Sequence, residues 1–222
     1  MNKGKRINKI CEFVDFPLVA EIGADHGQIS LNLVKTKKID KIYVTDISEK
    51  CLNKAIKTFK ENNLEHKAEF LVGDGLLVFN QPKPELQVVI AGMGGKEMIQ
   101  ILDSNKRVDQ ISHFILQPQK NVIELRQYLL SKGFKIVKDE MVEDSGKFYN
   151  VLKVEKGQES LSKLELVFGK TNLKEKGKDF LAFIKKEREM FETVATLTES
   201  TKPLDYIKLL DEIDEELKKE NT

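Results

Sequence analysis

Short apolar runs, several of them ending in glycine or aspartate, recur along the chain up to about residue 116. The first is Leu18-Val-Ala-Glu-Ile-Gly23, and an apolar run stopped by glycine is typical of a buried parallel strand. Segments with helical periodicity separate these runs. The pattern predicts strands at 18–23, 41–46, 68–72, 86–91 and 113–116, and helices at 5–15, 28–37, 48–62, 96–103 and 122–132.

The alternation of strands and helices changes in the segment 134–155. Residues 134–142 and 147–155 both fit strands, and the sequence Glu143-Asp-Ser-Gly146 between them suits the turn of a hairpin. Because strands that alternate with helices imply a parallel sheet, we expect an α/β fold with a doubly wound, mostly parallel sheet. An antiparallel strand closes this sheet.

From about residue 160 the chain loses its β character and becomes helical. Two amphipathic helices flank the breaker Ser200-Thr-Lys-Pro203 and should pack against each other as an antiparallel coiled coil. Their apolar positions are Phe180, Phe183, Ile184, Phe191, Val194 and Leu197, then Ile207, Leu210, Ile213 and Leu217. The sequence thus predicts two domains, residues 1–158 with the sheet and residues 159–222 as a C-terminal helical appendage.

Length and composition narrow the class of protein. A chain of 222 residues with 40% hydrophobic and 33% charged residues suits one folded α/β domain with an appendage and argues against wholesale disorder. No apolar stretch of about 18 residues occurs, so we expect a cytoplasmic protein that does not enter a membrane. We also expect a monomer. The net charge of +1 neither demands nor excludes a nucleic acid partner.

Histidine and cysteine spacing does not indicate a metal site. The three histidines, His26, His66 and His113, lie far apart in the sequence, and Cys11 and Cys51 each lack a second cysteine at ligand spacing. Only His26 lies within a motif, where a structural role competes with a role as general base. We therefore expect no metal.

The first strand turns into a helix through Gly23-Ala-Asp25-His26-Gly27. A glycine lets the backbone approach a ligand closely, and the start of a helix offers free N–H groups, so this turn suits a nucleotide-like ligand. Asp25 stands where dinucleotide-binding folds have a second glycine, and its charge would repel a pyrophosphate. It would tolerate or prefer a cationic ligand such as the sulfonium of S-adenosylmethionine. The alternative is an ordinary tight turn.

Acidic residues follow the next two strands. Asp46 lies 23 residues after Gly23, close to the spacing at which a carboxylate binds ribose hydroxyls in nucleotide-binding α/β folds, although it could also cap the following helix. In Gly73-Asp74-Gly75 a carboxylate flanked by glycines could accept a hydrogen bond from an adenine amino group, or simply form a turn. Ligands of such folds collect at this edge of the sheet.

Glycine and amide residues end the fourth and fifth strands. In Ala91-Gly92-Met93-Gly94-Gly95 three glycines leave a floor with few side chains, on which a flat base could lie. The amides of Gln117-Pro118-Gln119 could pair with a base edge, or belong to an ordinary proline-containing loop. The basic start with Lys3, Lys5, Arg6 and Lys9 could bind phosphates or be a solvated helix face.

Taken together, these segments resemble the bacterial tRNA adenine-N1 methyltransferase family that modifies adenosine at position 22. The matching stretches are AEIGADHG, VTDIS, GDGL, IAGMGG, ILQPQ, the helix with Glu124-Leu-Arg126, and Asp144-Ser-Gly-Lys-Phe-Tyr149. They run from Arg6 to about Leu152, and the helical tail also matches. The chain departs from the family at Ala24, where serine is common, and at Asn150.

The resemblance implies a Rossmann-like methyltransferase domain, S-adenosylmethionine as methyl donor and tRNA as partner. Residues expected at the cofactor are Gly23, Asp25, His26, Gly27, Asp46, Ile47, Gly73, Asp74, Gly75, Gly92 and Met93. Residues expected at the acceptor are Arg6, Gly94, Gly95, Gln117, Pro118, Gln119, Arg126 and Tyr149. Asp25 and Tyr149 are the expected catalytic residues, acting by electrostatics and by stacking on the base, without a general base.

Three other functions stay open from the sequence. A methyltransferase acting on another RNA or a small molecule would share the cofactor residues. An NAD-dependent oxidoreductase is disfavoured by Asp25, which replaces the middle glycine of its fingerprint. A non-catalytic adaptor built on the helical tail would leave the strand-end glycines and acids without a use.

Overall fold

The computed structural model describes residues 4–36, 39, 41–79, 85–104, 111–197 and 200–219. Two compact units divide the chain, one up to Ser160 and one from Leu161. Of the residues of the basic start, Lys3 lies outside the described residues.

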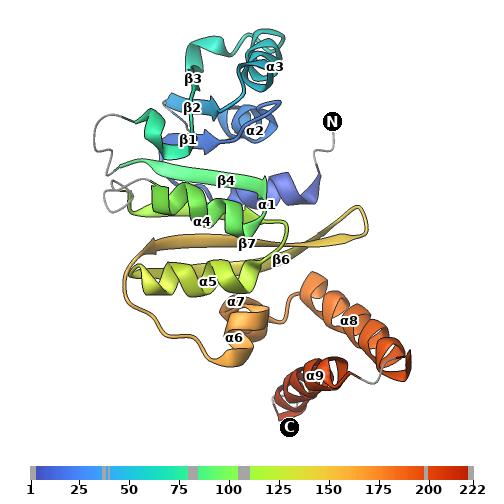
Figure 1. Ribbon diagram of the computed structural model, residues 1–222. Helices are drawn as coiled ribbons and strands as arrows, with labels where there is room; N and C mark the ends of the chain where they lie inside the picture. Colours follow the sequence, from blue (N-terminus) through green and yellow to red (C-terminus); the bar gives the residue numbers. More distant parts are fainter. Residues whose placement is uncertain are drawn as a thin grey trace. The chain divides into compact units, whose positions relative to one another are not determined.

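A seven-stranded sheet forms the first unit, in the order β3-β2-β1-β4-β5-β7-β6 (Figure 1). The first five strands pair in parallel, whereas β7 pairs antiparallel with both β5 and β6. The strands are β1 (Leu18–Ile22), β2 (Lys41–Asp46), β3 (Ala68–Val72), β4 (Gln87–Met93), β5 (His113–Pro118), β6 (Phe134–Asp144) and β7 (Lys147–Lys156). The predicted α/β class and mostly parallel sheet are confirmed, and the fold is Rossmann-like.

Helices cover both faces of this sheet (Figure 1). Helix α2 contacts both α1 and α3, and α4 contacts α5. They are α1 (Lys5–Phe13), α2 (Gln28–Thr36), α3 (Glu49–Lys60), α4 (Gly95–Ser104) and α5 (Val122–Ser131), with short 3-10 turns η1 (Glu65–Lys67) and η2 (Gly75–Val78). Ser48 caps α3, as its sequence position indicates, by accepting a hydrogen bond from the Cys51 N–H.

Strand order explains why the strand ends gather at one place. The chain runs outward from β1 through β2 to β3, then returns to the other side of β1 with β4 and β5. Ligands of such sheets bind beyond the carboxyl ends of the strands at this reversal point, between β1 and β4. The core below is apolar, with Val19, Val89 and Ile115 fully buried on the three central strands.

The predicted hairpin is present and longer than expected. Asp144 pairs with Lys147, so only Ser145 and Gly146 form the turn, with φ of 56° and 80°. Positive φ at both central residues is the signature of a type I′ turn, whose twist matches that of the two strands.

The second unit consists of α6 (Lys163–Phe168), α7 (Lys170–Glu175), α8 (Lys178–Leu197) and α9 (Lys202–Lys219). Arg188 on α8 pairs with Asp211 and Asp214 of α9, at 2.9 and 2.8 Å, and the rings of Phe191 and Tyr206 lie 4.3 Å apart. Among the described residues, no helix is long and apolar enough to cross a membrane.

Candidate functional site

The loop 23–27 between β1 and α2 folds through left-handed backbone conformations. Gly23, Asp25 and Gly27 have φ of 72°, 45° and 63°, and glycine reaches this region without the steric cost that other residues carry. The N–H groups of Gly23 and Ala24 both donate to the Thr45 carbonyl at 2.9 Å. The loop is therefore fixed against the end of β2.

Asp46 connects this loop to the start of α3. Its Oδ2 accepts from the Asp25 N–H at 3.0 Å, its Oδ1 accepts from the Ser48 N–H at 2.8 Å, and the residue is 7% exposed. Each carboxylate oxygen has a second lone pair, so Asp46 can accept further hydrogen bonds from a ligand without leaving this position.

Two cavities lie at the strand ends of the described structure. The smaller cavity, of about 170 Å³, is lined by Ile22, Gly23, Asp46, Ile47, Gly73, Asp74, Gly75, Met93 and Ile101. The larger cavity, of about 390 Å³, is lined by Arg6, Ile7, Glu21, Gly23, Ala24, Asp25, His26, Gln28, Ile29, Ala91, Gly92, Met93 and Gln119. Because Gly23 and Met93 line both cavities, the two cavities adjoin at these residues.

Gly23 packs closely against Met93 at this junction. A Cβ atom at position 23 would lie 2.0 Å from the Met93 Cε, so an alanine there would displace the end of the methionine side chain. The absence of a side chain at Gly23 thus leaves room for the Met93 side chain where the two cavities adjoin.

The smaller cavity offers carboxylates and apolar surface together. Asp46 and the exposed Asp74 line it, and Ile47 at its rim is 69% exposed. Carboxylates accept hydrogen bonds from hydroxyl and amino groups, while an exposed isoleucine suits a flat ring that needs covering. This combination fits a nucleoside.

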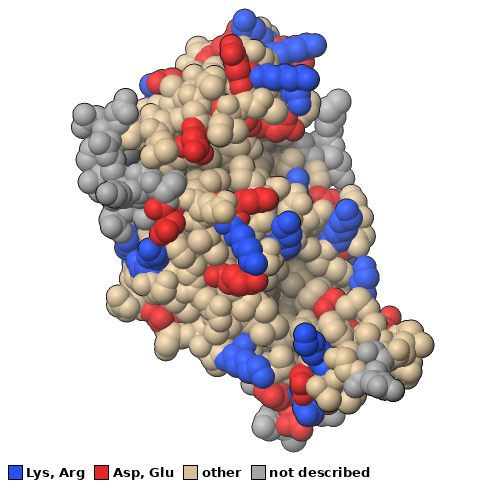
Figure 2. All heavy atoms as spheres, in the orientation of Figure 1, with Lys and Arg blue, Asp and Glu red and all other residues tan. Residues whose placement is uncertain are grey.

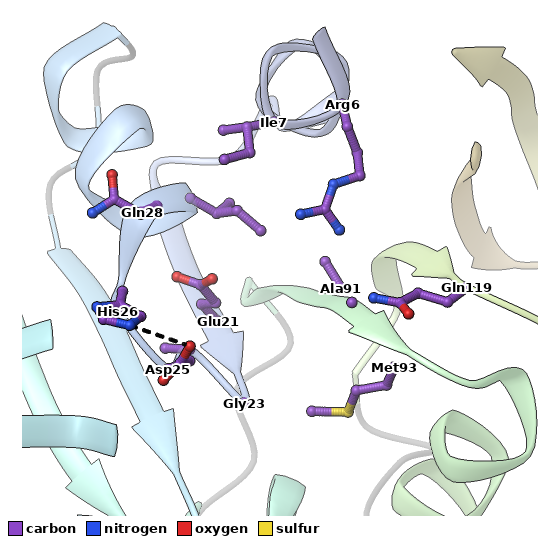
Figure 3. A pocket seen from close by; sticks show the side chains of 13 residues that line it. Arg6, Ile7, Glu21, Gly23, Asp25, His26, Gln28, Ala91, Met93 and Gln119 are labelled. Atoms are coloured by element: carbon purple, nitrogen blue, oxygen red, sulfur yellow. Dashed lines mark ion pairs between the residues drawn. The ribbon is translucent and has the colours of Figure 1, made fainter. Parts of the chain in front are cut away.

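The larger cavity has charged groups on opposite sides (Figure 3). Arg6 reaches in from α1 toward Ala91 of β4, whereas Asp25 and His26 lie across from it, with 3.7 Å between Asp25 Oδ2 and His26 Nε2. Lys54 on α3 donates to Asp25 Oδ1 at 2.9 Å, and this bond lowers the pKa of the Asp25 carboxyl. The cavity can therefore receive a small group that carries both charges.

Glu21, which the sequence does not single out as a site residue, also lines the larger cavity. It is the last residue but one of β1, and its Oε2 accepts hydrogen bonds from the N–H and the hydroxyl of Ser30. Burial raises the pKa of its carboxyl to about 7, and the nearby Asp46 adds to the shift. An acid inside an otherwise apolar strand is the signal that could have identified it.

We predict that Glu21 makes the stability of the folded chain depend on pH. The pKa of Glu21 is about 7 in the folded protein against an ordinary 4.5. Below about pH 4.5 the carboxyl is protonated in both the folded and the unfolded chain, so it does not destabilise the fold. As the pH rises through 7 the folded protein becomes less stable, because a buried charge has to form. Each pKa unit corresponds to about 1.4 kcal/mol, which gives about 3 kcal/mol in total.

Urea unfolding at pH 5 and pH 8 measures this effect. The loss of stability between the two pH values should be smaller by about 1–3 kcal/mol in Glu21→Gln, which keeps a hydrogen-bond acceptor and cannot ionise. Equal losses in both proteins would show that Glu21 titrates normally.

Gly94 and Gly95 lie away from both cavities. A Cβ on Gly95 would lie 2.3 Å from the backbone oxygen of Asn121, and one on Gly94 would lie 2.8 Å from the Lys120 Cε. The two glycines thus allow the start of α4 to pack against the loop after β5. Gly27 likewise packs tightly, since a Cβ there would lie 3.0 Å from that of Ala55.

The amide of Gln117 is fully buried, and Gln117 lines neither of these two cavities. Its Oε1 accepts from the Gly92 N–H at 3.2 Å and from Arg6 Nη1 at 2.8 Å, while its Nε2 donates to the Pro118 carbonyl at 3.0 Å. These bonds use the groups that were expected to read a base edge. Gln119, in contrast, lines the larger cavity beside Gly92.

Tyr149 on β7 is half-buried, and the Arg6 guanidinium carbon lies 5.3 Å from its ring centroid. Its predicted contact with a base therefore stays a prediction. The same holds for Pro118, which is buried in β5 opposite Met93.

Arg126 lines neither cavity. It is 0% exposed, and its Nε donates to Asp139 Oδ2 at 2.7 Å. Its Nη2 donates to Asn150 at 3.2 Å. The structure thus joins α5 to the edge of the sheet through a buried ion pair, at a residue expected to contact the acceptor.

The basic side chains of α1 are partly neutralised by the hairpin of β6 and β7. Lys5 pairs with Glu143 at 2.8 Å and Lys9 pairs with Glu140 at 2.6 Å. On the face drawn in Figure 2, basic and acidic side chains are interspersed among uncharged ones. Within the described part of the chain, no group of three or more His, Cys, Asp or Glu could hold a metal ion.

Comparison with known proteins places this geometry in a family. A model described as "Methyltransferase domain" matches residues 3–152. A Mycoplasma genitalium protein, provisionally named a tRNA methyltransferase, is 38% identical over 160 residues, which are 68% of this chain and 69% of that protein. The tRNA (adenine(22)-N(1))-methyltransferase of Bacillus subtilis is 26% identical over 155 residues, 69% of this chain and 65% of that protein.

A solved structure agrees with these relatives. The Streptococcus pneumoniae protein described provisionally as a tRNA (m1A22) methyltransferase, in complex with S-adenosyl-L-methionine, has a TM-score of 0.86 and 28% identity. The match covers 94% of this chain and 98% of that protein. The chain therefore belongs to the methyltransferase-domain family and is related to bacterial tRNA methyltransferases.

Proposed function

We propose that this chain transfers a methyl group from S-adenosylmethionine to N1 of adenosine 22 in tRNA. The observation that carries this proposal is the pair of adjoining cavities, one suited to a nucleoside and the other to a small group with both charges. The names of the relatives from Bacillus subtilis and Streptococcus pneumoniae support the acceptor.

The residues at the strand ends fit the parts of this cofactor. Asp46 would accept from the ribose hydroxyls, Asp74 from the adenine amino group, and Ile47 would cover the ring. The thioether portion would lie beside Gly23 and Met93, which line both cavities. When bound, S-adenosylmethionine supplies an electrophilic methyl group on a positively charged sulfur.

The protein does not need a strong base for this reaction. The N1 atom of adenine has an in-plane lone pair and carries no proton at neutral pH, so the residues have only to align it with the methyl group. The methylated base is cationic. Asp25, whose pKa is lowered by Lys54 and which is therefore ionised at neutral pH, would stabilise that charge.

The acceptor base would enter the larger cavity beside Gly92 and Gln119. N1 lies on the Watson–Crick edge, so a paired adenine would have to be opened or flipped out of its helix first. A Cβ on Gly92 would lie 3.8 Å from the Gln119 Nε2, so the amide borders an open surface on which a base could lie.

We predict that Gln119→Ala lowers kcat/KM for tRNA about 10-fold to 100-fold, since a lost amide contact to a base edge costs about 1–3 kcal/mol. The affinity for S-adenosylhomocysteine should stay within about twofold. Gln28→Ala removes another amide that lines the same cavity and serves as the control. Equal losses in both variants, or a parallel loss of cofactor affinity, would count against an acceptor role for Gln119.

We propose further that the second unit is an antiparallel coiled-coil appendage and that it holds the body of the tRNA. The enzyme as a whole is proposed to be cytoplasmic and monomeric. The pairing of Arg188 with Asp211 and Asp214 supports the close association of α8 and α9. Photo-crosslinking of tRNA to peptides from residues 161–219 tests the contact, and crosslinks confined to the first unit would exclude it.

The class of acceptor is tested by labelled methyl transfer. The chain is incubated with radiolabelled S-adenosylmethionine and either unmodified tRNA or a mixture of small metabolites. Label in tRNA supports the proposal. Label only in the metabolites would instead assign a small-molecule methyltransferase.

A further inference from the structure

Arg6 occupies an unusual place for a residue of the basic start. Its backbone N–H donates to Asp144 at 3.1 Å, while its side chain lines the larger cavity. Among the residues that line this cavity, Arg6 is the only lysine or arginine. It is therefore the permanent cation of a cavity that also contains Glu21 and Asp25.

Two groups hold the guanidinium in place. Nη1 donates to Gln117 at 2.8 Å, and the planar group lies over the ring of Tyr149, 5.3 Å from its centroid. An arginine has five N–H donors in a rigid fork, and within the described residues only the one to Gln117 has a partner. The remaining donors can bind an anion that enters the cavity.

Gln117 is itself held in place by a hydrogen bond to the backbone of β4. Its Oε1 accepts from the Gly92 N–H as well as from Arg6, and the side chain is fully buried. Gln117 thus links the guanidinium to the backbone at the end of β4. The guanidinium lies on the opposite side of the cavity from Asp25 and His26 (Figure 3).

We infer that Arg6 binds the carboxylate of the amino-acid end of the cofactor and that Gln117 is the positioning residue for Arg6. The inference rests on the proposed use of S-adenosylmethionine. That end of the cofactor is zwitterionic, so in this cavity its ammonium faces carboxyl groups and its carboxylate needs a cation. Arg6 supplies that cation with a fork that matches a carboxylate in geometry. The basic start suggests that Arg6 binds tRNA phosphates. If Arg6 binds the cofactor instead, other residues bind those phosphates.

Two ligands that differ only in the carboxylate test the inference. Calorimetry measures the affinity of S-adenosylhomocysteine and of its decarboxylated form, which keeps the amine. Wild-type protein should prefer the carboxylated ligand, and Arg6→Gln should reduce this preference about 10-fold to 100-fold, the range for hydrogen bonds to charged groups. Lys5→Gln is the matched control, because it removes the same charge from the neighbouring residue, which pairs with Glu143.

Gln117 gives a second measurement. Gln117→Leu should lower the preference for the carboxylated ligand, and the Arg6→Gln/Gln117→Leu pair should lose no more than Arg6→Gln alone.

The outcomes separate this inference from the proposed function. If the wild type binds neither ligand, the proposed use of the cofactor fails. If it binds both and Arg6→Gln keeps the full preference, the inference alone is overturned. A raised KM for tRNA with a shallower salt dependence and no change in ligand preference would identify Arg6 as a phosphate contact instead.

Discussion

Replacing Asp46 with alanine should reduce the affinity for S-adenosylhomocysteine by at least about 100-fold, the largest effect that we expect on ligand binding. The substitution removes the acceptor for two ribose hydroxyls, and charge-assisted hydrogen bonds contribute about 1.5–3 kcal/mol each. It also leaves the Asp25 and Ser48 N–H groups without the bonds that fix loop 23–27 to α3.

The matched control is Glu49→Ala, which removes a carboxylate from the exposed first residue of α3. Calorimetric affinities of the three proteins compare the effects. A Kd for Asp46→Ala within threefold of the wild-type value would remove Asp46 from the cofactor site.

The largest effect on stability should come from Asp139→Ala. Asp139 and Arg126 are 1% and 0% exposed and lie 2.7 Å apart, and loss of the acid leaves a guanidinium buried without its counter-ion. Breaking such a pair costs about 3–5 kcal/mol. Urea unfolding should therefore show a large fall in the free energy of unfolding.

An exposed ion pair of similar geometry provides the comparison. Asp103 and Lys132 are 2.8 Å apart, but about half of each side chain is exposed, so Asp103→Ala should cost less than about 1 kcal/mol. If the two variants lose the same stability, the buried pair does not support the fold, and the predicted acceptor role of Arg126 regains weight.

Local sequence patterns predict the sheet well because they coincide with what the strands bury. The expected strands at 41–46 and 68–72 match β2 and β3 at both ends. β4 continues beyond the predicted end at residue 91, because Met93 pairs with Pro118 past a bulge. Glycines at this point conceal the strand, since they weaken its apolar pattern.

The residues on the cofactor side of the site can also be predicted from the sequence. Gly23 follows β1, Asp46 ends β2 and Asp74 lies two residues after β3. A parallel sheet necessarily brings such positions to one edge. Their proximity in the two cavities therefore follows from the order of the strands. Glu21 could not be predicted as a site residue in this way, because it lies within a strand rather than at its end.

The acceptor side could not be predicted in the same way. The amide of Gln117 faces inward because β5 pairs with β4 and places it under Gly92, and the partner of Arg126 comes from an edge strand after it in the chain. Arg6 reaches the cavity only because α1 packs beside the strand ends. Such contacts depend on tertiary packing, about which a local motif carries no information.

The most direct test of the proposed reaction is the identity of the methylated nucleotide. Unmodified tRNA is treated with the protein and S-adenosylmethionine, digested with nucleases and analysed by mass spectrometry, with a tRNA carrying guanosine at position 22 in parallel. We expect N1-methyladenosine at position 22 and no methylation of the guanosine variant. A different methylated nucleoside, or equal methylation of both tRNAs, would contradict it.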